Sequence, residues 1–279
     1  MELSLSIASF PLDSETIHDM HGLLEMTEVD YSKPLFDSSW HLDDISGFAV
    51  LAYTEENELL GFAVAVDLIG LDSYEWSAFV HPEFRRMTIG SALEGGIAYG
   101  LEQRQAIEGL AAFIEDEVAK KFLASLGYQP DFKEIELEAE PLEVLDLPEN
   151  LAVVPYDGEI EKLEKLMAAA FDEEVLPVVH YNIERTDREV FIMKREEELV
   201  ASASLFEEEG GLWITAFAVD PSEQGKGYGK AFLLWCRHYA SLQGKHRTVL
   251  EVETDNDALA VYRKSVFHPV HTVEYWNKP

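Results

Sequence analysis

Residues Val219–Lys230 read VDPSEQGKGYGK and follow an apolar run, Trp213 to Val219, that is typical of a strand. An apolar pattern with helical spacing comes directly after them. Glycines let such a loop turn tightly and point successive N–H groups inward, and the following helix adds the positive end of its dipole. Lys226 and Lys230 add positive charge. The sequence therefore predicts a loop that binds an anion.

The spacing of the glycines excludes two common nucleotide loops. Gly225, Gly227 and Gly229 form G-x-G-x-G rather than the G-x-G-x-x-G of dinucleotide folds. Ala231 stands where a triphosphate loop needs Ser or Thr for magnesium. With Gln224 as its first residue, the segment instead resembles the pyrophosphate loop of the GNAT acyltransferase superfamily. The resemblance implies that the ligand is acetyl-CoA.

A second signature lies downstream of the loop. It follows a strand-like run, Thr248 to Val252, and resembles the family pattern in which an Asn leads a helix that ends in Tyr-x-Lys-x-Gly-Phe. Val266 stands where the family usually has Gly, so the turn after this helix is expected to differ. A glycine-lysine loop alone is also compatible with a plain turn, and the second signature favours the ligand site. The matching residues are Asn256, Tyr262, Lys264 and Phe267.

The same pattern occurs twice, at a constant offset of 139 residues. A constant register through strand, loop, helix, strand and helix indicates a duplicated domain. We therefore expect two GNAT-like domains, 1–140 and 151–279, joined by the acidic, proline-containing linker 141–150. The aligned residues are Val80, Pro82, Gly90, Ala92 and Tyr128 in the first copy and Val219, Pro221, Gly229, Ala231 and Phe267 in the second.

Hairpin-like strands followed by alternating helices and strands indicate a mixed α/β fold with a mostly antiparallel sheet flanked by helices. In the first half we expect strands at 3–9, 48–53, 59–66, 74–80, 110–114 and 135–139, and helices at 90–104 and 117–126. In the second half we expect strands at 151–154, 189–193, 200–205, 212–219, 248–252 and 270–276.

The two copies differ where the family performs chemistry. Thr88 lies opposite Gly227, and a β-branched residue restricts the approach of a pyrophosphate to the backbone. Leu123 lies opposite Tyr262 and cannot donate a proton, and Glu117 lies opposite Asn256. We interpret the N-terminal copy as a degenerate domain that keeps the fold without turnover. Its remaining cations opposite the loop, Arg85 and Arg86, are still able to hold a phosphate.

Charge is distributed unequally between the halves. Residues 1–150 contain seven Lys and Arg against thirty-one Asp and Glu, whereas residues 151–279 contain fourteen against twenty-three, so the net charges are −24 and −9 of the total −33. Because CoA is strongly anionic, the C-terminal half is the better host. The alternative is that the acidic surface serves only solubility or salt tolerance. Nucleic acid is disfavoured as a partner.

Composition and length agree with two compact domains. The 279 residues are 47% hydrophobic, enough for two cores of usual size. No apolar run approaches the ~20 residues of a membrane span, and the start lacks the basic segment of a secretory signal, so we expect a cytoplasmic protein. Cys236 is the single cysteine and lies in an apolar helix pattern that favours a core position. No metal site is indicated, because the nine His are scattered.

The resemblance implies direct attack of an amine on the acetyl thioester. Backbone N–H groups around Phe217, Ala218 and Val219 would polarise the thioester carbonyl, and Asn256 would anchor the pantetheine arm. Tyr262 would protonate the departing thiolate, although it is also compatible with a tyrosine that merely packs on the sheet. The pyrophosphate would lie on Gln224, Gly225, Lys226, Gly227, Tyr228, Gly229 and Lys230.

The sequence leaves the base, the acceptor and the oligomeric state open. Glu251 and His238 are candidates for the base by proximity alone, and each is compatible with an ordinary sheet or surface residue. His180 and Tyr181 lie in the region that lines the acceptor groove in the family. The acceptor is expected to be a small-molecule or peptide amine. The alternatives are a non-catalytic CoA-binding or interaction scaffold, and binding of CoA by both domains.

Overall fold

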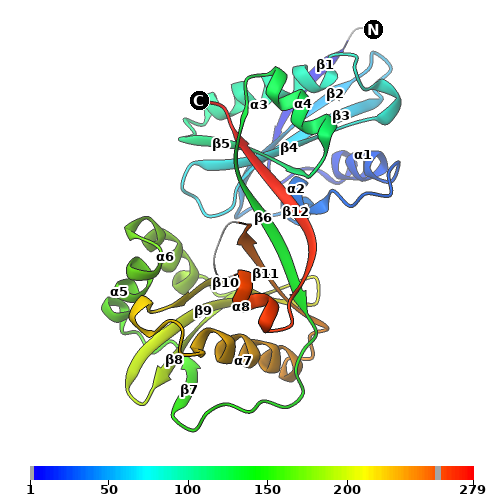
Figure 1. Ribbon diagram of the computed structural model, residues 1–279. Helices are drawn as coiled ribbons and strands as arrows, with labels where there is room; N and C mark the ends of the chain where they lie inside the picture. The colour runs from blue at the N-terminus through cyan, green and yellow to red at the C-terminus, as the bar shows by residue number, and fades with distance from the viewer. Residues whose placement is uncertain (1–2, 255–258) are drawn as a thin grey trace. The chain divides into compact units, whose positions relative to one another are not determined.

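The computed structural model describes residues 3–254 and 259–279, which form two compact units (Figure 1). Unit 1 comprises Met1–Lys133 and Val273–Pro279, and unit 2 comprises Glu134–Thr272. Within the described part of the chain, no helix is both long and apolar enough to cross a membrane.

Unit 1 is a mixed sheet covered by helices on both faces. Its described strands have the order β1-β2-β3-β4-β5-β12, in which β4 and β5 are parallel and the other pairs antiparallel. Helix α3 covers one face and α1 the other, so β3 is buried along its whole length. The elements are β1 (Ser4–Ser9), α1 (Ser14–Leu24), α2 (Ser32–Leu35), η1 (Asp37–Ser39), β2 (Ser46–Tyr53), β3 (Leu59–Asp67), β4 (Ser73–Val80), η2 (Pro82–Phe84), α3 (Ile89–Gln103), β5 (Glu108–Ile114) and α4 (Glu117–Ser125).

Unit 2 repeats this plan. Its described strands have the order β6-β11-β10-β9-β8-β7, in which only β10 and β11 are parallel. Helix α7 packs on one face, and α5 and α6 pack on the other. The elements are β6 (Gln129–Ala139), β7 (Leu151–Pro155), α5 (Ile160–Ala170), η3 (Glu173–Val175), α6 (Leu176–Glu184), β8 (Arg188–Arg195), β9 (Glu198–Glu208), β10 (Gly211–Val219), η4 (Pro221–Glu223), α7 (Tyr228–Leu242), β11 (Arg247–Glu253), α8 (Leu259–Lys264) and β12 (His268–Asn277).

The mixed α/β fold expected from the sequence is confirmed, and every expected strand overlaps an observed one. Their apolar periodicity has a simple cause, since successive residues of a strand point to opposite faces of the sheet and so to the two helix layers in turn. The segment 140–150 has neither helix nor strand along its described length, and it runs against α7. There the Arg237 Nε donates to the Glu140 carbonyl at 2.8 Å, and the Leu142 N–H donates to the Arg237 carbonyl at 2.9 Å.

The units exchange their last strands. The end of β6, from the first half of the sequence, pairs antiparallel with β11 in unit 2, and the end of β12 pairs antiparallel with β5 in unit 1. The registers agree with the duplication, because Ala111 lies opposite Trp276 and Leu250 lies opposite Leu137, each partner 139 residues from its counterpart. Each unit therefore completes its sheet with a strand from the other half.

Because of this exchange, the observed units differ from the continuous ranges expected from the sequence. Residues 134–140 belong to unit 2 rather than to the first half, and residues 273–279 belong to unit 1 rather than to the second. The physical reason is that duplicated units present equivalent edges, at β5 and at β11, to the final strand of either copy. An alternating strand pattern specifies which face is buried but not which copy supplies the edge.

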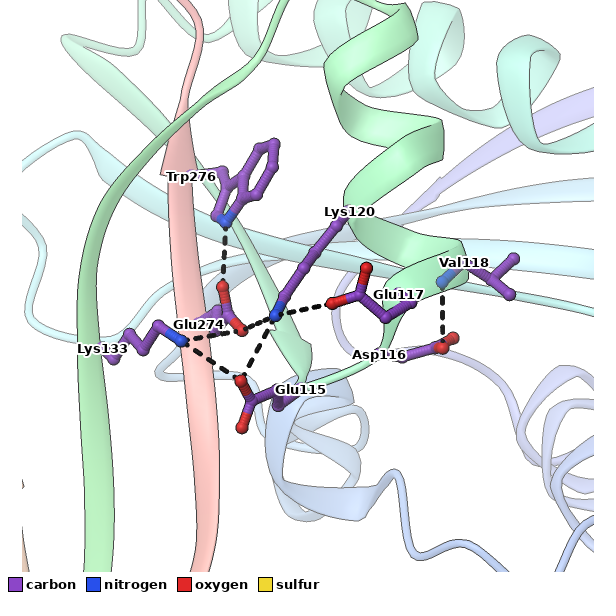
Figure 2. Close-up of polar contacts among 8 residues, drawn as sticks. All are labelled: Glu115, Asp116, Glu117, Val118, Lys120, Lys133, Glu274 and Trp276. Carbon is purple, nitrogen blue, oxygen red and sulfur yellow. Dashed lines mark hydrogen bonds and ion pairs between the residues drawn. The ribbon is translucent and has the colours of Figure 1, made fainter.

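A polar cluster holds β12 in unit 1 (Figure 2). The Glu274 carboxylate is only 2% exposed and accepts hydrogen bonds from Lys133 Nζ at 3.1 Å and from Trp276 Nε1 at 3.3 Å. Lys120 Nζ lies 2.9 Å from the same carboxylate and 3.2 Å from Glu115. The buried carboxylate is thus paired with two cations, as burial of a charge requires.

Candidate active site

The loop before α7 has the backbone shape predicted for anion binding. Gly225 and Gly227 have φ angles of +77° and +90°, in the left-handed region that favours glycine. A Cβ atom added at either position would meet no described atom within 4 Å, so conformation and not space explains these glycines. Helix α7 starts at Tyr228 without a side-chain cap, which leaves its first N–H groups available to a ligand.

The side chains of this loop are partly committed to one another. The Gln224 Nε2 donates to the Val219 carbonyl at 3.3 Å, which closes the turn. Lys226 Nζ lies 2.9 Å from Glu223, and the same carboxylate accepts a 2.7 Å hydrogen bond from Arg195 Nη1. An incoming phosphate therefore competes with Glu223 for Lys226. Lys230 is exposed on the first turn of α7.

Arg195, at the end of β8, was not singled out by the sequence analysis. Its Nη1 also donates to the Tyr228 hydroxyl at 3.3 Å, and its Nη2 donates to Glu198. These contacts with Tyr228, then Glu198, raise the pKa of Arg195 above its usual value. Arg195 thus links the loop, through Glu223 and Tyr228, to the β8–β9 hairpin. A lone arginine at a strand end belongs to no motif, so the sequence offered no signal for it.

Strand β10 contains a β-bulge in front of the loop. Its register against β9 shifts between Thr215 and Ala218, and Ala216 has a φ of +48°. The side-chain alternation changes there, because Leu212 and Ile214 pack towards α7 before the bulge and Phe217 and Val219 do so after it. Pairing of β10 with β11 extends only to Ile214, opposite Leu250. The backbone at Phe217, Ala218 and Val219 therefore lies at a distorted segment beyond the paired part of two parallel strands.

Tyr262 lies on α8 and is 6% exposed. Its ring centroid is 6.2 Å from that of Phe217, on the bulged strand, and 6.5 Å from that of Phe267. Burial raises the pKa of Tyr262 to about 12. The phenol therefore stays protonated at neutral pH, as a proton donor must. Asn256 lies outside the described residues.

The two residues considered as base, and His180 of the expected acceptor groove, differ in their surroundings. Glu251 is on β11, where Leu250 and Val252 pack in the α7 layer, so its side chain lies on the opposite face. The His238 ring, in contrast, is within hydrogen-bond distance of the Leu142 carbonyl, 2.9 Å from Nδ1, and is directed to the segment after β6. His180 Nε2 lies 2.9 Å from Glu164, between α6 and α5. Of these residues, Glu251 alone lies on a strand that borders the bulge.

Unit 1 repeats the loop without its first two glycines. Arg86 and Thr88 have φ angles of +68° and +65°, matching Gly225 and Gly227. Arg85 Nε donates to the Val80 carbonyl at 3.2 Å, the counterpart of the Gln224 contact. Thr88 thus adopts the left-handed conformation, and its effect comes from its side chain, whose Oγ1 donates to the Met87 carbonyl at 2.6 Å. That side chain occupies a position that is open above Gly227.

Strand β4 of unit 1 differs from β10 because it has no bulge. All of its residues are described, and its register against β3 runs from Gly61–Val80 to Val66–Glu75 without a shift. Tyr74, Trp76 and Val80 accordingly all pack towards α3. The strand diverges from β5 beyond Trp76 and Ala111, as β10 diverges from β11. The bulge is therefore a difference between two otherwise matching units.

Comparison with known proteins identifies the family. The model of the acetyltransferase (GNAT) family matches residues 16–128 and again residues 155–266. The chain belongs to the GNAT acetyltransferase family. Each match falls within a different copy of the sequence repeat, which confirms that the chain contains two GNAT domains. Among curated proteins, no match was found for this GNAT chain.

Solved structures with the same fold include other GNAT proteins. The GCN5-related N-acetyltransferase from Sphaerobacter thermophilus has 16% identity and a TM-score of 0.71, with coverage of 98% of this chain and 95% of that one. A tandem GNAT protein from the clavulanic acid biosynthesis pathway has 14% identity and a TM-score of 0.70, with coverage of 98% of both chains. At such identities the likeness shows the fold alone.

Proposed function

We propose that this tandem GNAT protein is an acetyl-CoA-dependent N-acetyltransferase whose active site lies in unit 2. The observation that best supports this assignment is the bulge at Thr215–Ala218, which occurs in β10 and not in β4. A bulge releases backbone N–H groups from the ladder and re-aims them, as a site that polarises a thioester carbonyl requires. The open space above Gly225 and Gly227 supports the same unit.

In this mechanism the protein binds and orients acetyl-CoA without forming a covalent intermediate. The loop Gln224–Lys230 and the start of α7 bind the pyrophosphate, and Asn256 anchors the pantetheine arm. Backbone N–H groups at Phe217–Val219 stabilise the negative charge that develops on the carbonyl oxygen. The cytoplasmic amine acceptor attacks the carbonyl carbon in its neutral form.

Proton transfers complete the reaction. The amine loses one proton as the new C–N bond forms, and we assign Glu251, on the strand next to the bulged β10, to accept it through water. The C–S bond breaks and the thiolate of CoA leaves. Tyr262 donates its proton to that thiolate as the C–S bond breaks, since its raised pKa keeps the phenol protonated at neutral pH. Transfer of a proton back to Tyr262 from solvent restores the enzyme.

Unit 1, in this proposal, is a degenerate domain. The unbulged β4, the Thr88 side chain and Leu123 in place of Tyr262 each remove one part of the site. The second candidate function is a non-catalytic CoA-binding or interaction scaffold. The strand exchange favours this candidate, because each half of the sequence supplies a strand to the sheet of the other unit. Unit 1 is therefore needed for folding even if it has no turnover.

Calorimetric titration of acetyl-CoA into the wild type and two matched variants tests the assignment. Gly227→Asp places a carboxylate in the loop of unit 2, and Thr88→Asp places it at the equivalent position of unit 1. We expect one site per chain, lost in Gly227→Asp and retained in Thr88→Asp, with circular dichroism unchanged. Two sites would contradict the degenerate role of unit 1, and no binding by folded wild type would overturn the function.

Thiol release in the presence of amines then separates the enzyme from the scaffold. A wild type that binds acetyl-CoA but releases no CoA thiol with any amine, while Tyr262→Phe binds acetyl-CoA equally well, would favour the scaffold. Release that depends on the amine and decreases in Tyr262→Phe supports the acetyltransferase.

A further inference from the structure

Arg188, the first residue of β8, is a half-buried arginine held between two aromatic rings. Its Cζ lies 4.3 Å from the centroid of Phe206 and 5.2 Å from that of Tyr181. Its Nη1 donates to Asn182 Oδ1 at 2.9 Å. Burial lowers the pKa of Arg188 from its usual value, but an arginine remains charged at neutral pH. Arg188 is therefore a fixed, flat cation.

The other edge of this guanidinium lacks an acceptor among the described residues. Nε of Arg188 is buried without a hydrogen-bond partner, and so is Nδ2 of Asn182, a residue that is 2% exposed. Nε and Nη2 form the side edge with which an arginine binds both oxygens of a carboxylate. Buried donors without acceptors destabilise the free protein, so an acceptor supplied by a ligand would be favoured there.

The surrounding acids do not supply that acceptor. Among residues 3–254 and 259–279, the hydrogen bond of Arg188 is to Asn182 and not to an acid, although Asp187 and Glu208 lie near enough to attract it and the chain contains 54 Asp and Glu. The adjacent carboxylate, Asp187, is bound by Arg185, whose Nε and Nη2 donate to it at 2.8 and 2.7 Å. In so acidic a protein, an arginine fork left open is unusual, and it points to an external anion.

The position of Arg188 connects this fork to the proposed acetyl site. Arg188 and Val190 share a strand face, and Val190 packs with Ala216, Ala218 and α5 on the face opposite α7. Because the phosphate loop leads into α7, CoA would approach on the α7 side and the acceptor on the side of α5 and α6, where Arg188 contacts Asn182. Arg188 pairs with Phe206, and Phe206 pairs with Trp213 of β10, so the three residues form one row across the sheet.

The positions of these residues set the distance between an amine at the acetyl site and an anion bound by Arg188. Along β9, Ser202, the partner of Ala218, lies four residues from Phe206, a distance of about 13 Å. Arg188 lies two strand spacings from β10, about 10 Å across the sheet. The arginine side chain spans part of this distance. An amine at the acetyl site and a carboxylate at Arg188 are then separated by an extended chain and not by a single carbon.

We propose that Arg188 binds the carboxylate of the acceptor, and that the acceptor of unit 2 is an elongated amino carboxylate rather than a simple amine. This inference rests on the proposed acetyltransferase function. The two rings beside the guanidinium leave access in its plane, which favours a planar carboxylate over a tetrahedral phosphate. Asn182 fixes the guanidinium by its Nη1 and leaves the side edge free for the ligand.

Three acceptors of matched chemistry test the inference with the full chain. The probes are 6-aminohexanoate, n-hexylamine, which lacks the carboxylate, and glycine, whose amine and carboxylate are too close together. We expect wild type to acetylate 6-aminohexanoate with the highest kcat/KM. Arg188→Gln should reduce kcat/KM for it by about 10- to 100-fold, the loss expected for charge-assisted hydrogen bonds, and leave n-hexylamine unchanged. Arg188→Lys should recover part of the activity, and Arg104→Gln is the matched control, because Arg104 also lies over a phenylalanine ring but belongs to unit 1.

Binding provides a readout that does not require turnover. Calorimetric titration with 6-acetamidohexanoate should show binding to wild type and Arg104→Gln but not to Arg188→Gln, with acetyl-CoA affinity equal in all three. Equal acetylation of n-hexylamine and 6-aminohexanoate, or no binding of 6-acetamidohexanoate to a wild type that binds acetyl-CoA, would overturn the role of Arg188 and leave the acetyltransferase intact. Absence of acetyl-CoA binding would instead overturn the proposed function.

Discussion

Glu274 and Lys120 form an ion pair at 2.9 Å that joins two distant parts of the sequence inside unit 1. Lys120 is on α4, and Glu274 is on the exchanged strand β12. The contact with Glu274 is the main reason that the pKa of Lys120 is raised above its usual value. The side chain of Glu274 is 3% exposed, whereas that of Lys120 is 22% exposed. The carboxylate, which has lost its contact with water, therefore depends on the ion pair more than the ammonium does.

Glu274→Gln should therefore destabilise unit 1. The buried amide accepts fewer hydrogen bonds than the carboxylate, whose two oxygens serve both lysines and Trp276, so we expect the free energy of unfolding to fall by about 1–3 kcal/mol. Hydrogen exchange should increase in β5, α4 and the end of β12. Glu117→Gln is the control, because Glu117 contacts the same Lys120 nitrogen at 3.3 Å but is 75% exposed. An equal effect of both changes would contradict the role of burial.

The sequence predicted the strands, the loop and the duplication, since each depends on local periodicity or on glycine spacing. The exchange of β6 and β12 was not predictable, because the same alternating pattern fits the edge of either unit. The bulge was only implied by family resemblance. It depends on one extra residue between Thr215 and Ala218, which no residue type marks.

Side-chain partners were the other part that the sequence left open. Lys226 was expected to bind phosphate, and the fold also places Glu223 beside it. Arg188 and Arg195 were not singled out, because an arginine has a defined role only once its partners are known. The contact between Arg195 and Glu223 joins residues 28 positions apart, beyond the range of any local pattern.

Cys236 should be inert in the native protein. Its side chain is fully buried in the α7 core layer, and burial raises the pKa of the thiol above its usual range, so the reactive thiolate does not form near neutral pH. Ellman's reagent should detect no thiol in the folded chain and a single thiol in denaturant. Rapid labelling of the native protein would contradict this packing. The inert cysteine also leaves thiol release as a clean assay for CoA.

Tyr262→Phe should reduce kcat by about 100-fold, the usual contribution of a general acid, with acetyl-CoA affinity unchanged. Because burial raises the pKa of Tyr262 to about 12, its phenol remains protonated well above pH 10. Ionisation of Tyr262 should therefore cause no decrease of kcat below pH 10. Any decrease in that range should be the same in wild type and in Tyr262→Phe. As to stability, the raised pKa favours the folded state below pH 10, and this contribution is lost as the pH rises towards 12.

Tyr239→Phe is the control for this change. Burial, followed by the hydrogen bond to Glu189, also raises the pKa of Tyr239 to about 12, but its hydroxyl donates to that carboxylate at 2.7 Å and is not directed to the bulge. We expect kcat of Tyr239→Phe within about twofold of wild type, as for changes outside a site. An equal loss in both variants would show that Tyr262 acts by packing in the core.

Glu223→Gln should tighten acetyl-CoA binding. The carboxylate of Glu223 neutralises Lys226 in the free loop, and a glutamine can still accept the hydrogen bond from Arg195 that fixes the turn. Release of a partly exposed lysine from such a pair corresponds to about two- to fivefold in affinity, and the gain should shrink as salt is added. Arg195→Gln should have the opposite effect, because the loop loses its link to the β8–β9 hairpin. Glu198→Gln, which changes only the outer partner of Arg195, should leave the affinity unchanged. If Glu223→Gln weakens binding as much as Arg195→Gln does, Glu223 serves to hold the loop and does not compete with the pyrophosphate.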